Sequence, residues 1–246
     1  MYTLLATDLD GTLVGNDSAL VALNLFLSPL RDSGVLKLAY VTGRSLEMYT
    51  DLQREHNLLK PDALITAVGS EIYLDGVRQS DWPNVQTWDV QHVLRVLARY
   101  PTLRPQPLTE QRDYKRCYYF DDGAAVIPKI QAELGNKYTV IYSSNQYLDI
   151  LPIGVNKATA LQQLGTYWNL PATDIITAGD SGNDIAMLAN YKGIIVGNAS
   201  TELLEWQANS TNSDLYLARA SQAAGIYEGL QHFGYSLPMT TPVVGS

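Results

Sequence analysis

The sequence predicts an α/β protein with a doubly wound, Rossmann-like parallel sheet and a smaller α/β domain inserted into it. Three observations support this prediction. Strand-like and helix-like segments alternate over the first 75 residues, and the same alternation returns after residue 155. Between these halves the pattern changes, with four prolines between residues 81 and 113. Strands that alternate with helices form parallel sheets covered by helices on both faces.

The first half of the chain predicts three strands and two helices. Short apolar runs predict the strands, and leucines spaced by three and four positions predict one face of the first helix. A serine N-cap predicts where the second helix begins. In chain order, the expected elements are a strand at 3–7, a helix around 20–30, a strand at 36–43, a helix at 45–56 and a strand at 62–70.

The second half continues the alternation up to the last residues. Its expected elements are a helix at 156–170, a strand that runs into the loop GDSGND (179–184), a helix at 186–191, a strand at 193–198, a helix at 201–208, a strand at 214–218 and a helix at 221–233. The final stretch, 236–246, loses its periodicity and is expected to be irregular.

The middle of the chain predicts a compact unit of its own. Its expected elements are a helix at 89–99, a strand at 115–121, a helix at 124–134 and strands at 138–143 and 147–151. We therefore expect a core made of residues 1–80 and 155–246. The inserted domain is expected to span residues 81–154, between the third and fourth strands of the core.

Composition limits the classes of partner and the compartment. The formal net charge is −8 and no lysine or arginine run occurs, which argues against nucleic acid and anionic membrane surfaces as partners. No apolar run approaches the ~20 residues that a membrane-spanning helix needs. Cys117 is the single cysteine, so no internal disulfide can form, and no secretory leader is evident. We expect a cytoplasmic protein and a monomer.

Four loops at one edge of the predicted sheet carry polar side chains. The first follows the strand in LLATDLDGTL and holds Asp8 and Asp10, whose carboxylates repel each other unless a cation lies between them. Parallel α/β sheets bind ligands beyond the carboxyl ends of their strands. The other three loops carry Thr42, Gly43 and Arg44; Lys157; and Asp180, Asn183 and Asp184.

These residue types suit phosphoryl transfer. Mg²⁺ prefers oxygen ligands and commonly takes one or two carboxylates together with phosphate and water, which Asp8, Asp10 and Asp180 or Asp184 can supply. A carboxylate can also attack phosphorus to give an aspartyl-phosphate. The hydroxyl of Thr42 and the ammonium of Lys157 can bind phosphoryl oxygens, while the second aspartate of the pair can protonate a leaving alkoxide.

The motifs DLDGTLV, VTGRS, Lys157 and GDSGND occur in this order and resemble the haloacid dehalogenase (HAD) superfamily of Mg²⁺-dependent phosphatases. The insert resembles the C2-type cap of that superfamily. The resemblance implies these roles: Asp8 as nucleophile, Asp10 as general acid and base, Thr42 and Lys157 as phosphate-binding residues, Asp8, Asp10, Asp180 and Asp184 as the metal site, and Asn183 as a residue that orients Lys157 or the phosphate.

A narrower resemblance involves ITAVGSEIY (65–73), LDILP (148–152) and GDSGNDIAML, which are similar to the sucrose-phosphate phosphatases. It implies hydrolysis of sucrose 6-phosphate to sucrose and phosphate, and association with a sucrose-phosphate synthase. The residues it implies for substrate binding are Gly43, Arg44, Gly69, Ser70, Glu71, Lys115, Asp149 and Asn183. Two alternatives stay open: the same chemistry on glucosylglycerol-phosphate or mannosyl-3-phosphoglycerate, and a non-catalytic sugar-binding partner of a synthase.

Competing interpretations of the motifs are weaker. An EF-hand would need acidic residues at Ala6 and Asp17, and only the second is acidic. The string GDSG also surrounds the nucleophile of trypsin-like proteases, which would make Ser181 reactive. That reaction needs a histidine, and none of the three histidines falls in a predicted strand-end loop. Two tryptophans near the insert, Trp82 and Trp88, are candidates for stacking on a sugar.

Overall fold

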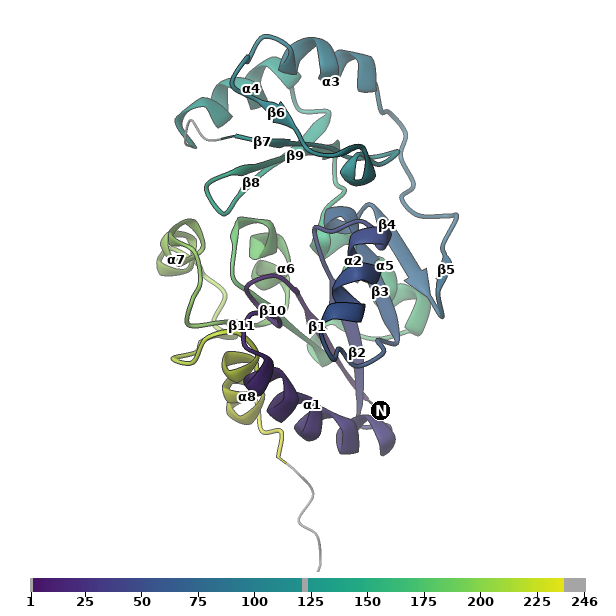
Figure 1. Cartoon of the computed structure of the whole chain (residues 1–246), viewed down its shortest axis with the longest axis vertical. Coiled ribbons are helices and arrows are strands. Elements are labelled where there is room, and N and C mark those ends of the chain that lie inside the picture. The colour runs from purple at the N-terminus through teal and green to yellow at the C-terminus, as the bar shows by residue number, and fades with distance from the viewer. Residues whose placement is uncertain (1, 121–123, 237–246) are drawn as a thin grey trace, which may run out of the picture.

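The computed structural model describes residues 2–120 and 124–236 and contains two sheets (Figure 1). The larger sheet has eight strands and the smaller has four. Within the described part of the chain, no helix combines the length and apolar character needed to cross a bilayer. The C-terminal segment expected to be irregular lies almost entirely outside the described residues.

The larger sheet forms the centre of the core. Its strand order is β12-β11-β10-β1-β2-β3-β4-β5, and the six strands from β12 to β3 are parallel. The bounds are β1 Thr3–Thr7, β2 Leu36–Val41, β3 Ala63–Thr66, β4 Glu71–Leu74, β5 Val77–Arg78, β10 Ile175–Gly179, β11 Lys192–Ile195 and β12 Leu215–Leu217. Since β1 lies between β2 and β10, the loops after these strands meet at one edge.

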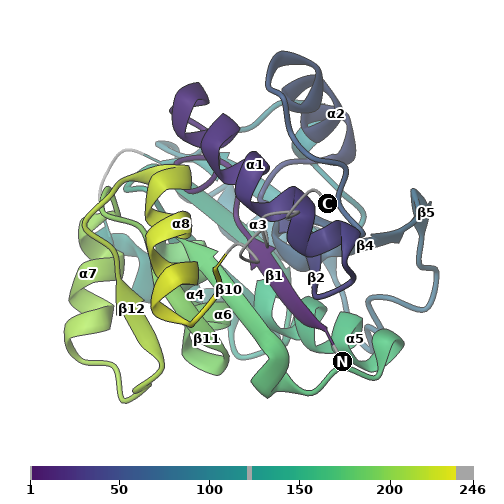
Figure 2. The same cartoon turned by 90° about the horizontal axis from the view of Figure 1, so that it is seen from below.

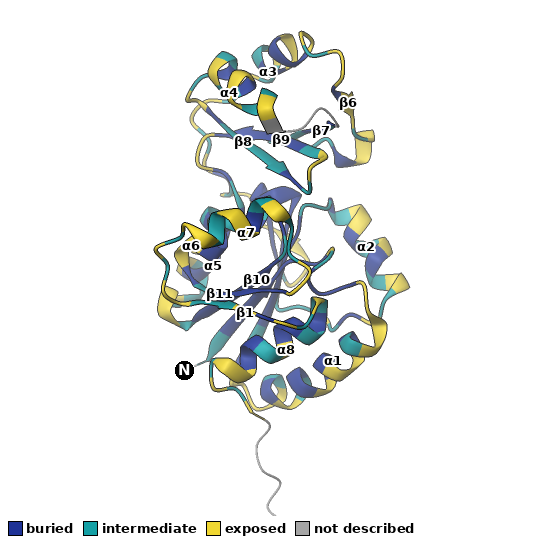
Figure 3. Ribbon diagram, turned by 90° about the vertical axis from the view of Figure 1, so that its left-hand side faces the viewer, coloured by how far each residue is buried: buried dark blue, intermediate teal, exposed yellow. Residues whose placement is uncertain are grey.

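Helices cover both faces of this sheet, as predicted for a doubly wound fold (Figure 3). They are α1 Asp17–Asp32, α2 Leu46–Glu55, α5 Lys157–Trp168, α6 Ile185–Asn190, α7 Thr201–Ala208 and α8 Gln222–His232. Seen from below, α1 and α8 lie side by side (Figure 2). Between them, the rings of Phe26 and Tyr227 pack edge to face, with centroids 4.8 Å apart. The opposite face packs on α5 and α6 through Leu161, Leu164 and Met187.

The smaller sheet is antiparallel, with the order β6-β7-β9-β8. Its strands are β6 Arg104–Pro105, β7 Arg116–Tyr119, β8 Tyr138–Ser143 and β9 Tyr147–Pro152, and its helices are α3 Val90–Leu97 and α4 Ile127–Leu134. One face, which includes Leu148 and Ile150, packs on these helices. Because side chains alternate along a strand, Tyr147 and Asp149 lie on the other face, toward the core.

One predicted strand, 62–70, is wrong in its length. The strand β3 ends at Thr66, and the chain reverses through Ala67, Val68 and Gly69, whose φ angles are 50°, 59° and 96°. A hairpin of β4 and β5 then extends the core sheet before the chain enters the second sheet. The apolar run hid this turn, because alanine and valine rarely adopt positive φ. Gly69 is required there, since a Cβ would lie 2.2 Å from the carbonyl oxygen of Asn156.

Candidate active site

Three carboxylates from two strand-end loops converge in the core. Asp8 follows β1, and Asp180 and Asp184 follow β10. One carboxylate oxygen of each lies within 4.8 Å of the others. Asp8 and Asp184 are buried, at 5% and 0% exposure. The motifs predicted these three together with Asp10, and the parallel register of β1 and β10 is what brings the three together.

Lys157, the first residue of α5, provides one positive charge for these carboxylates. Its Nζ donates to Oδ1 of Asp8 and to Oδ1 of Asp184, both at 2.7 Å. Burial opposes the charge on this ammonium, but the carboxylates of Asp184 and Asp8 outweigh that effect and raise its pKa above the ordinary value. One ammonium against three carboxylates leaves an excess of negative charge.

The excess charge makes the site suitable for a divalent cation. Burial, together with the charges of Asp184 and Asp180, raises the pKa of Asp8 well above its ordinary value. Burial and the charge of Asp184 raise the pKa of Asp180 to about 7. A hard cation among these oxygens would relieve the repulsion that raises both pKa values, and oxygen ligands are what such cations prefer. The residues present therefore fit a metal ion.

Hydrogen bonds fix the geometry of the loop after β10. Oδ2 of Asp184 accepts from the backbone N–H groups of Asp180 and Ser181, at 3.0 and 3.1 Å. The hydroxyl of Thr12 donates to Oδ1 of Asp180 at 2.8 Å. A Cβ at Gly11 would lie 2.5 Å from the carboxylate of Asp180, so glycine is needed in DLDGT for this close approach. The two loops thus hold each other in place.

Asp10 does not join the group of three carboxylates, although we expected it to bind the metal with them. Its carboxylate instead accepts two hydrogen bonds from Arg44, both at 2.7 Å. The side chain is 52% exposed and lines a cavity next to Asp8. The two-pronged geometry of the guanidinium explains this orientation, because paired N–H groups match the two oxygens of a carboxylate. The predicted role of Asp10 in proton transfer is compatible with this position.

A cavity of ≈ 270 Å³ separates the core edge from the smaller sheet. Its lining from the core includes Asp8, Asp10, Gly43, Arg44, Ser181 and Asn183. Its lining from the smaller sheet and the segment before it includes Glu110, Lys115, Tyr119, Ser143, Tyr147 and Asp149. Thr42 is fully buried next to Gly43, and its hydroxyl oxygen accepts from the backbone N–H of Arg44 at 3.1 Å.

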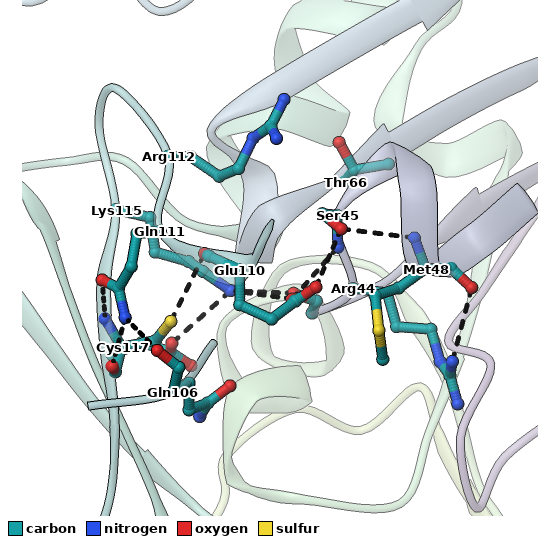
Figure 4. Close-up of polar contacts among 12 residues, drawn as sticks. Arg44, Ser45, Met48, Thr66, Gln106, Glu110, Gln111, Arg112, Lys115 and Cys117 are labelled. Atoms are coloured by element: carbon teal, nitrogen blue, oxygen red, sulfur yellow. Dashed lines mark hydrogen bonds and ion pairs between the residues drawn. The ribbon is translucent and has the colours of Figure 1, made fainter. Parts of the chain in front are cut away.

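Buried polar groups form the side of the cavity opposite Asp8 (Figure 4 shows Lys115 and Glu110). The ammonium of Lys115 donates to the carbonyl of Gly43 at 3.0 Å and lies 3.9 Å from Oε2 of Glu110. Oδ1 of Asp149 is 3.7 Å from the same ammonium, beyond hydrogen-bond distance, and has no hydrogen-bond partner among the described residues. Burial raises the pKa of Asp149, while Lys115 opposes the shift.

Some of the residues expected to bind substrate line the cavity, and others do not. Five line the cavity: Gly43, Arg44, Lys115, Asp149 and Asn183. Gly69, Ser70 and Glu71 do not belong to its lining. Glu71, at 1% exposure, accepts hydrogen bonds from Thr66, Tyr73 and Arg112 at 2.8, 3.0 and 2.9 Å, so its carboxylate joins the core to the smaller sheet instead. Gly69 packs against the start of α5.

Several residues of the cavity were not predicted from the sequence, among them Glu110, Tyr119, Ser143 and Tyr147. Tyr119 and Tyr147 are paired across β7 and β9, with ring centroids 6.0 Å apart. The spacing of these residues in the sequence could have predicted them. Tyr119 lies four residues after Lys115, and Tyr147 lies two residues before Asp149, and side chains at even spacing along an extended segment share one face. The tryptophans proposed for sugar stacking lie outside the cavity: Trp82 donates to the carbonyl of Gly69, and Trp88 to that of Asp113.

Among the described residues, no histidine lines the cavity beside Ser181, although a serine hydrolase would require one there. Ser181 lines the cavity, but the three histidines of the chain lie elsewhere. The ring of His56 is 2.9 Å from Asp17, and those of His92 and His232 stack on Tyr138 and Tyr216. Ser181 therefore lacks the base that would activate it.

Two solved phosphatase structures have the fold of this chain. A phosphatase of the HAD enzyme superfamily from Bacteroides thetaiotaomicron has the same fold, with a TM-score of 0.74 and 21% identity over 96% of each chain. A sucrose-phosphatase from Synechocystis sp. PCC6803, solved in complex with sucrose and phosphate, is much more similar. Its TM-score is 0.90 and its identity 35%, over 96% of this chain and 99% of that one.

The sequence comparisons identify the family. The family model for sucrose-6F-phosphate phosphohydrolase matches residues 1–234, so the chain belongs to this family, as its motifs predicted. Sucrose-phosphatase 1 of Nicotiana tabacum is 32% identical over 97% of this chain. The match covers 60% of the tobacco protein, so the chain spans about three fifths of that relative's length.

Proposed function

We propose that this chain is a Mg²⁺-dependent phosphomonoesterase that hydrolyses sucrose 6-phosphate to sucrose and phosphate. One observation carries the proposal: a buried aspartate, Asp8, which lies next to two further carboxylates, lines a cavity whose opposite side holds the buried side chains of Lys115 and Asp149. The first side suits a phosphoryl group and the second suits sugar hydroxyls. The likeness to a sucrose-phosphatase over nearly the whole chain supports this choice of sugar.

In the proposed first step, a carboxylate oxygen of Asp8 attacks phosphorus in line with the sugar oxygen. The bond from phosphorus to the sugar oxygen breaks as the bond to Asp8 forms, which gives an aspartyl-phosphate. Asp10 gives its proton to the departing alkoxide, since this alkoxide is a poor leaving group. In the second step, Asp10 takes a proton from water as the water attacks phosphorus, and phosphate leaves with Asp8 restored.

The surrounding groups stabilise charge on the phosphoryl oxygens. Lys157 is fully buried and uses two hydrogens for Asp8 and Asp184; we assign the third to a phosphoryl oxygen bound at Asp8. The hydroxyl of Thr42 accepts from Arg44 and retains its own hydrogen for donation. Mg²⁺ bound by Asp8, Asp180 and Asp184 would neutralise negative charge on the same oxygens.

The pairing of Asp10 with Arg44 has a consequence for proton transfer. Both carboxylate oxygens of Asp10 accept hydrogen bonds from Arg44, so neither is available to a substrate oxygen in this arrangement. We therefore expect Asp10 to exchange Arg44 for the substrate oxygen when the sugar phosphate binds. Arg44, which also lines the cavity, is then free to contact the substrate.

A substrate panel tests this function. Phosphate release is measured with Mg²⁺ and with EDTA for sucrose 6-phosphate, glucosylglycerol-phosphate and mannosyl-3-phosphoglycerate. We expect metal-dependent turnover with the highest kcat/KM for sucrose 6-phosphate. A higher kcat/KM for another member of the panel would support the same reaction on a different sugar phosphate. If no member released phosphate, the proposed phosphatase activity would be contradicted.

We further propose that the enzyme is a cytoplasmic monomer that associates with a sucrose-phosphate synthase. All the site residues described above come from one chain, and Cys117 is buried and forms no disulfide. Size-exclusion chromatography with light scattering tests the monomer. Co-elution with a purified synthase tests the association, because separate elution at micromolar concentrations would contradict a stable complex.

A further inference from the structure

Glu110 belongs to the segment that leads into the smaller sheet, but its carboxylate binds the core (Figure 4). It ends a short 3₁₀ helix, Leu108–Glu110, which precedes β7. Oε1 accepts from the hydroxyl of Ser45 at 2.8 Å, and Oε2 accepts from the backbone N–H of Ser45 at 3.2 Å. Both residues are buried, with Glu110 at 6% exposure and Ser45 at 0%. This contact joins positions 65 residues apart in the sequence.

Lys115 makes a second contact with the same stretch of the core. Its ammonium donates to the carbonyl of Gly43 at 3.0 Å and lies 3.9 Å from Glu110. The two charges therefore bind residues 43–45, directly after Thr42. The backbone of Arg44, in the middle of this stretch, donates to the hydroxyl oxygen of Thr42. The hydrogen bonds of Glu110 and Lys115, together with the backbone of residues 42–45, thus connect Glu110 to a residue proposed to bind phosphate.

The carboxylate of Glu110 accepts its hydrogen bonds from Ser45 only when the two parts of the molecule are together. Ser45 is the N-cap of α2, where free N–H groups and the helix dipole favour a negative charge. A buried carboxylate without donors would be strongly destabilised by the loss of water. In an open arrangement, Glu110 and Ser45 would each return to solvent. Closure therefore exchanges two hydrated groups for a paired, buried contact beside Lys115.

We propose that Glu110 is a positioning residue that couples closure over the cavity to the order of residues 42–45. This inference rests on the proposed function, because it assumes a substrate large enough to contact both sides of the cavity. Glu110 acts through Ser45 and takes no part in bond breaking. Its charge matters more for a sugar phosphate, which needs closure, than for a small phosphate ester that reaches Asp8 without it.

The test compares Glu110→Gln with Glu133→Gln in the full chain with Mg²⁺. Glu133 is a matched control, because its carboxylate bonds only within the smaller unit as far as the described contacts go, to Arg99 and Tyr100. We expect E110Q to lower kcat/KM for sucrose 6-phosphate about tenfold, the effect of weakening one charge-assisted hydrogen bond. The fall for p-nitrophenyl phosphate should be several-fold smaller, and E133Q should change neither. Equal falls for both substrates would overturn the proposal.

Amide hydrogen exchange supplies a readout that needs no substrate. The N–H of Ser45 donates to Glu110, so its exchange should become faster in E110Q and stay unchanged in E133Q. Unchanged exchange in E110Q would refute the coupling. Should the wild-type protein release no phosphate from sucrose 6-phosphate, the proposed function fails and this exchange result alone decides the role of Glu110.

A double variant guards against a general loss of folding. Ser45→Ala removes the hydroxyl that donates to Glu110, so E110Q should cost little more once Ser45 is replaced. Costs in kcat/KM that simply multiply would show that the two residues act independently and would contradict the proposal.

Discussion

The core edge and the opposite side of the cavity differ in how completely their polar groups are paired. At the core edge, Lys157 bonds two carboxylates, and Asp184 accepts from Lys157 and from two backbone N–H groups. Across the cavity, Oδ1 of Asp149 and the hydroxyl of Ser143 are buried without a hydrogen-bond partner among the described residues. Oδ1 of Asn183 at the core edge is also buried without such a partner, but the carboxylates and the ammonium there are paired with one another. Across the cavity, the carboxylate of Asp149 itself still has an oxygen to satisfy.

This difference indicates that the core edge stabilises the transition state and that the opposite side binds the sugar. Preorganised groups stabilise charge in a transition state without moving, which is what the paired carboxylates and ammonium at the core edge can do. Buried groups without partners are destabilising until something binds them, and sugar hydroxyls can both donate and accept hydrogen bonds. We therefore expect substitutions at the core edge to affect all phosphate esters. Substitutions across the cavity should affect sugar phosphates most.

The largest effect is expected for Asp8→Asn, which removes the proposed nucleophile. Turnover should fall at least about a thousandfold for sucrose 6-phosphate and for p-nitrophenyl phosphate alike, as for other nucleophile deletions. The fold should persist, because burial already disfavours the charge on Asp8. Asp51→Asn, on an exposed carboxylate of α2, is the control. Normal activity of the Asp8 variant would refute the assignment.

The next effect concerns stability and the metal. Lys157→Met leaves the carboxylates of Asp8 and Asp184 without their shared ammonium, and breaking a buried pair in this way costs about 3 kcal/mol or more. Urea unfolding in EDTA should show this loss, and Mg²⁺ should recover part of it, since a cation replaces the missing charge. Lys60→Met, at an exposed position, should change neither measurement. A loss that Mg²⁺ does not reduce would argue against a metal among these carboxylates.

The same two regions differ in how much of them could be predicted from the sequence. The site residues of the core lie in short motifs at strand ends, and a parallel sheet brings strand ends together whatever the loops contain. Asp8, Asp180, Asp184 and Lys157 therefore meet as predicted. The orientation of Asp10 could not be read in this way, because it depends on Arg44, which lies 34 residues away.

Across the cavity, the sequence was less informative. Glu110 lies in a proline-rich stretch without periodicity, and its partner Ser45 is remote in sequence, so nothing local marks it. For the stretch at 65–73, the motif predicted sugar contacts, and the structure places Glu71 outside the cavity lining, after the turn at Ala67 and Val68, with its carboxylate bonded to Arg112. Positive φ at such residues is set by tertiary packing and has no local sequence signal.

Asp149→Asn tests the side of the cavity opposite the core edge, where Oδ1 of Asp149 lacks a hydrogen-bond partner among the described residues. We expect kcat/KM for sucrose 6-phosphate to fall roughly tenfold to a hundredfold, the range for leaving a buried polar group without its hydrogen-bond partner. The fall for p-nitrophenyl phosphate should be much smaller, because this ester lacks sugar hydroxyls. Asp113→Asn, on an exposed carboxylate of the same unit, is the control. Equal loss on both substrates would place Asp149 with the core-edge residues and remove the distinction between the two regions.

The smallest effect is a pH dependence of stability that Asp149→Asn should abolish. Burial raises the pKa of Asp149, so the folded protein keeps its proton at pH values where the unfolded chain has lost it. Between the ordinary value of about 4 and the raised pKa, the folded state binds more protons, and the free energy of unfolding therefore falls as pH rises. Each unit of the raised pKa accounts for about 1.4 kcal/mol. Urea unfolding of the wild-type protein and of the Asp149→Asn variant from pH 5 to 8 measures this dependence. The free energy of unfolding of the wild-type protein relative to that of the variant should decline as pH rises. A constant difference would mean that Asp149 gains a compensating partner on ionisation.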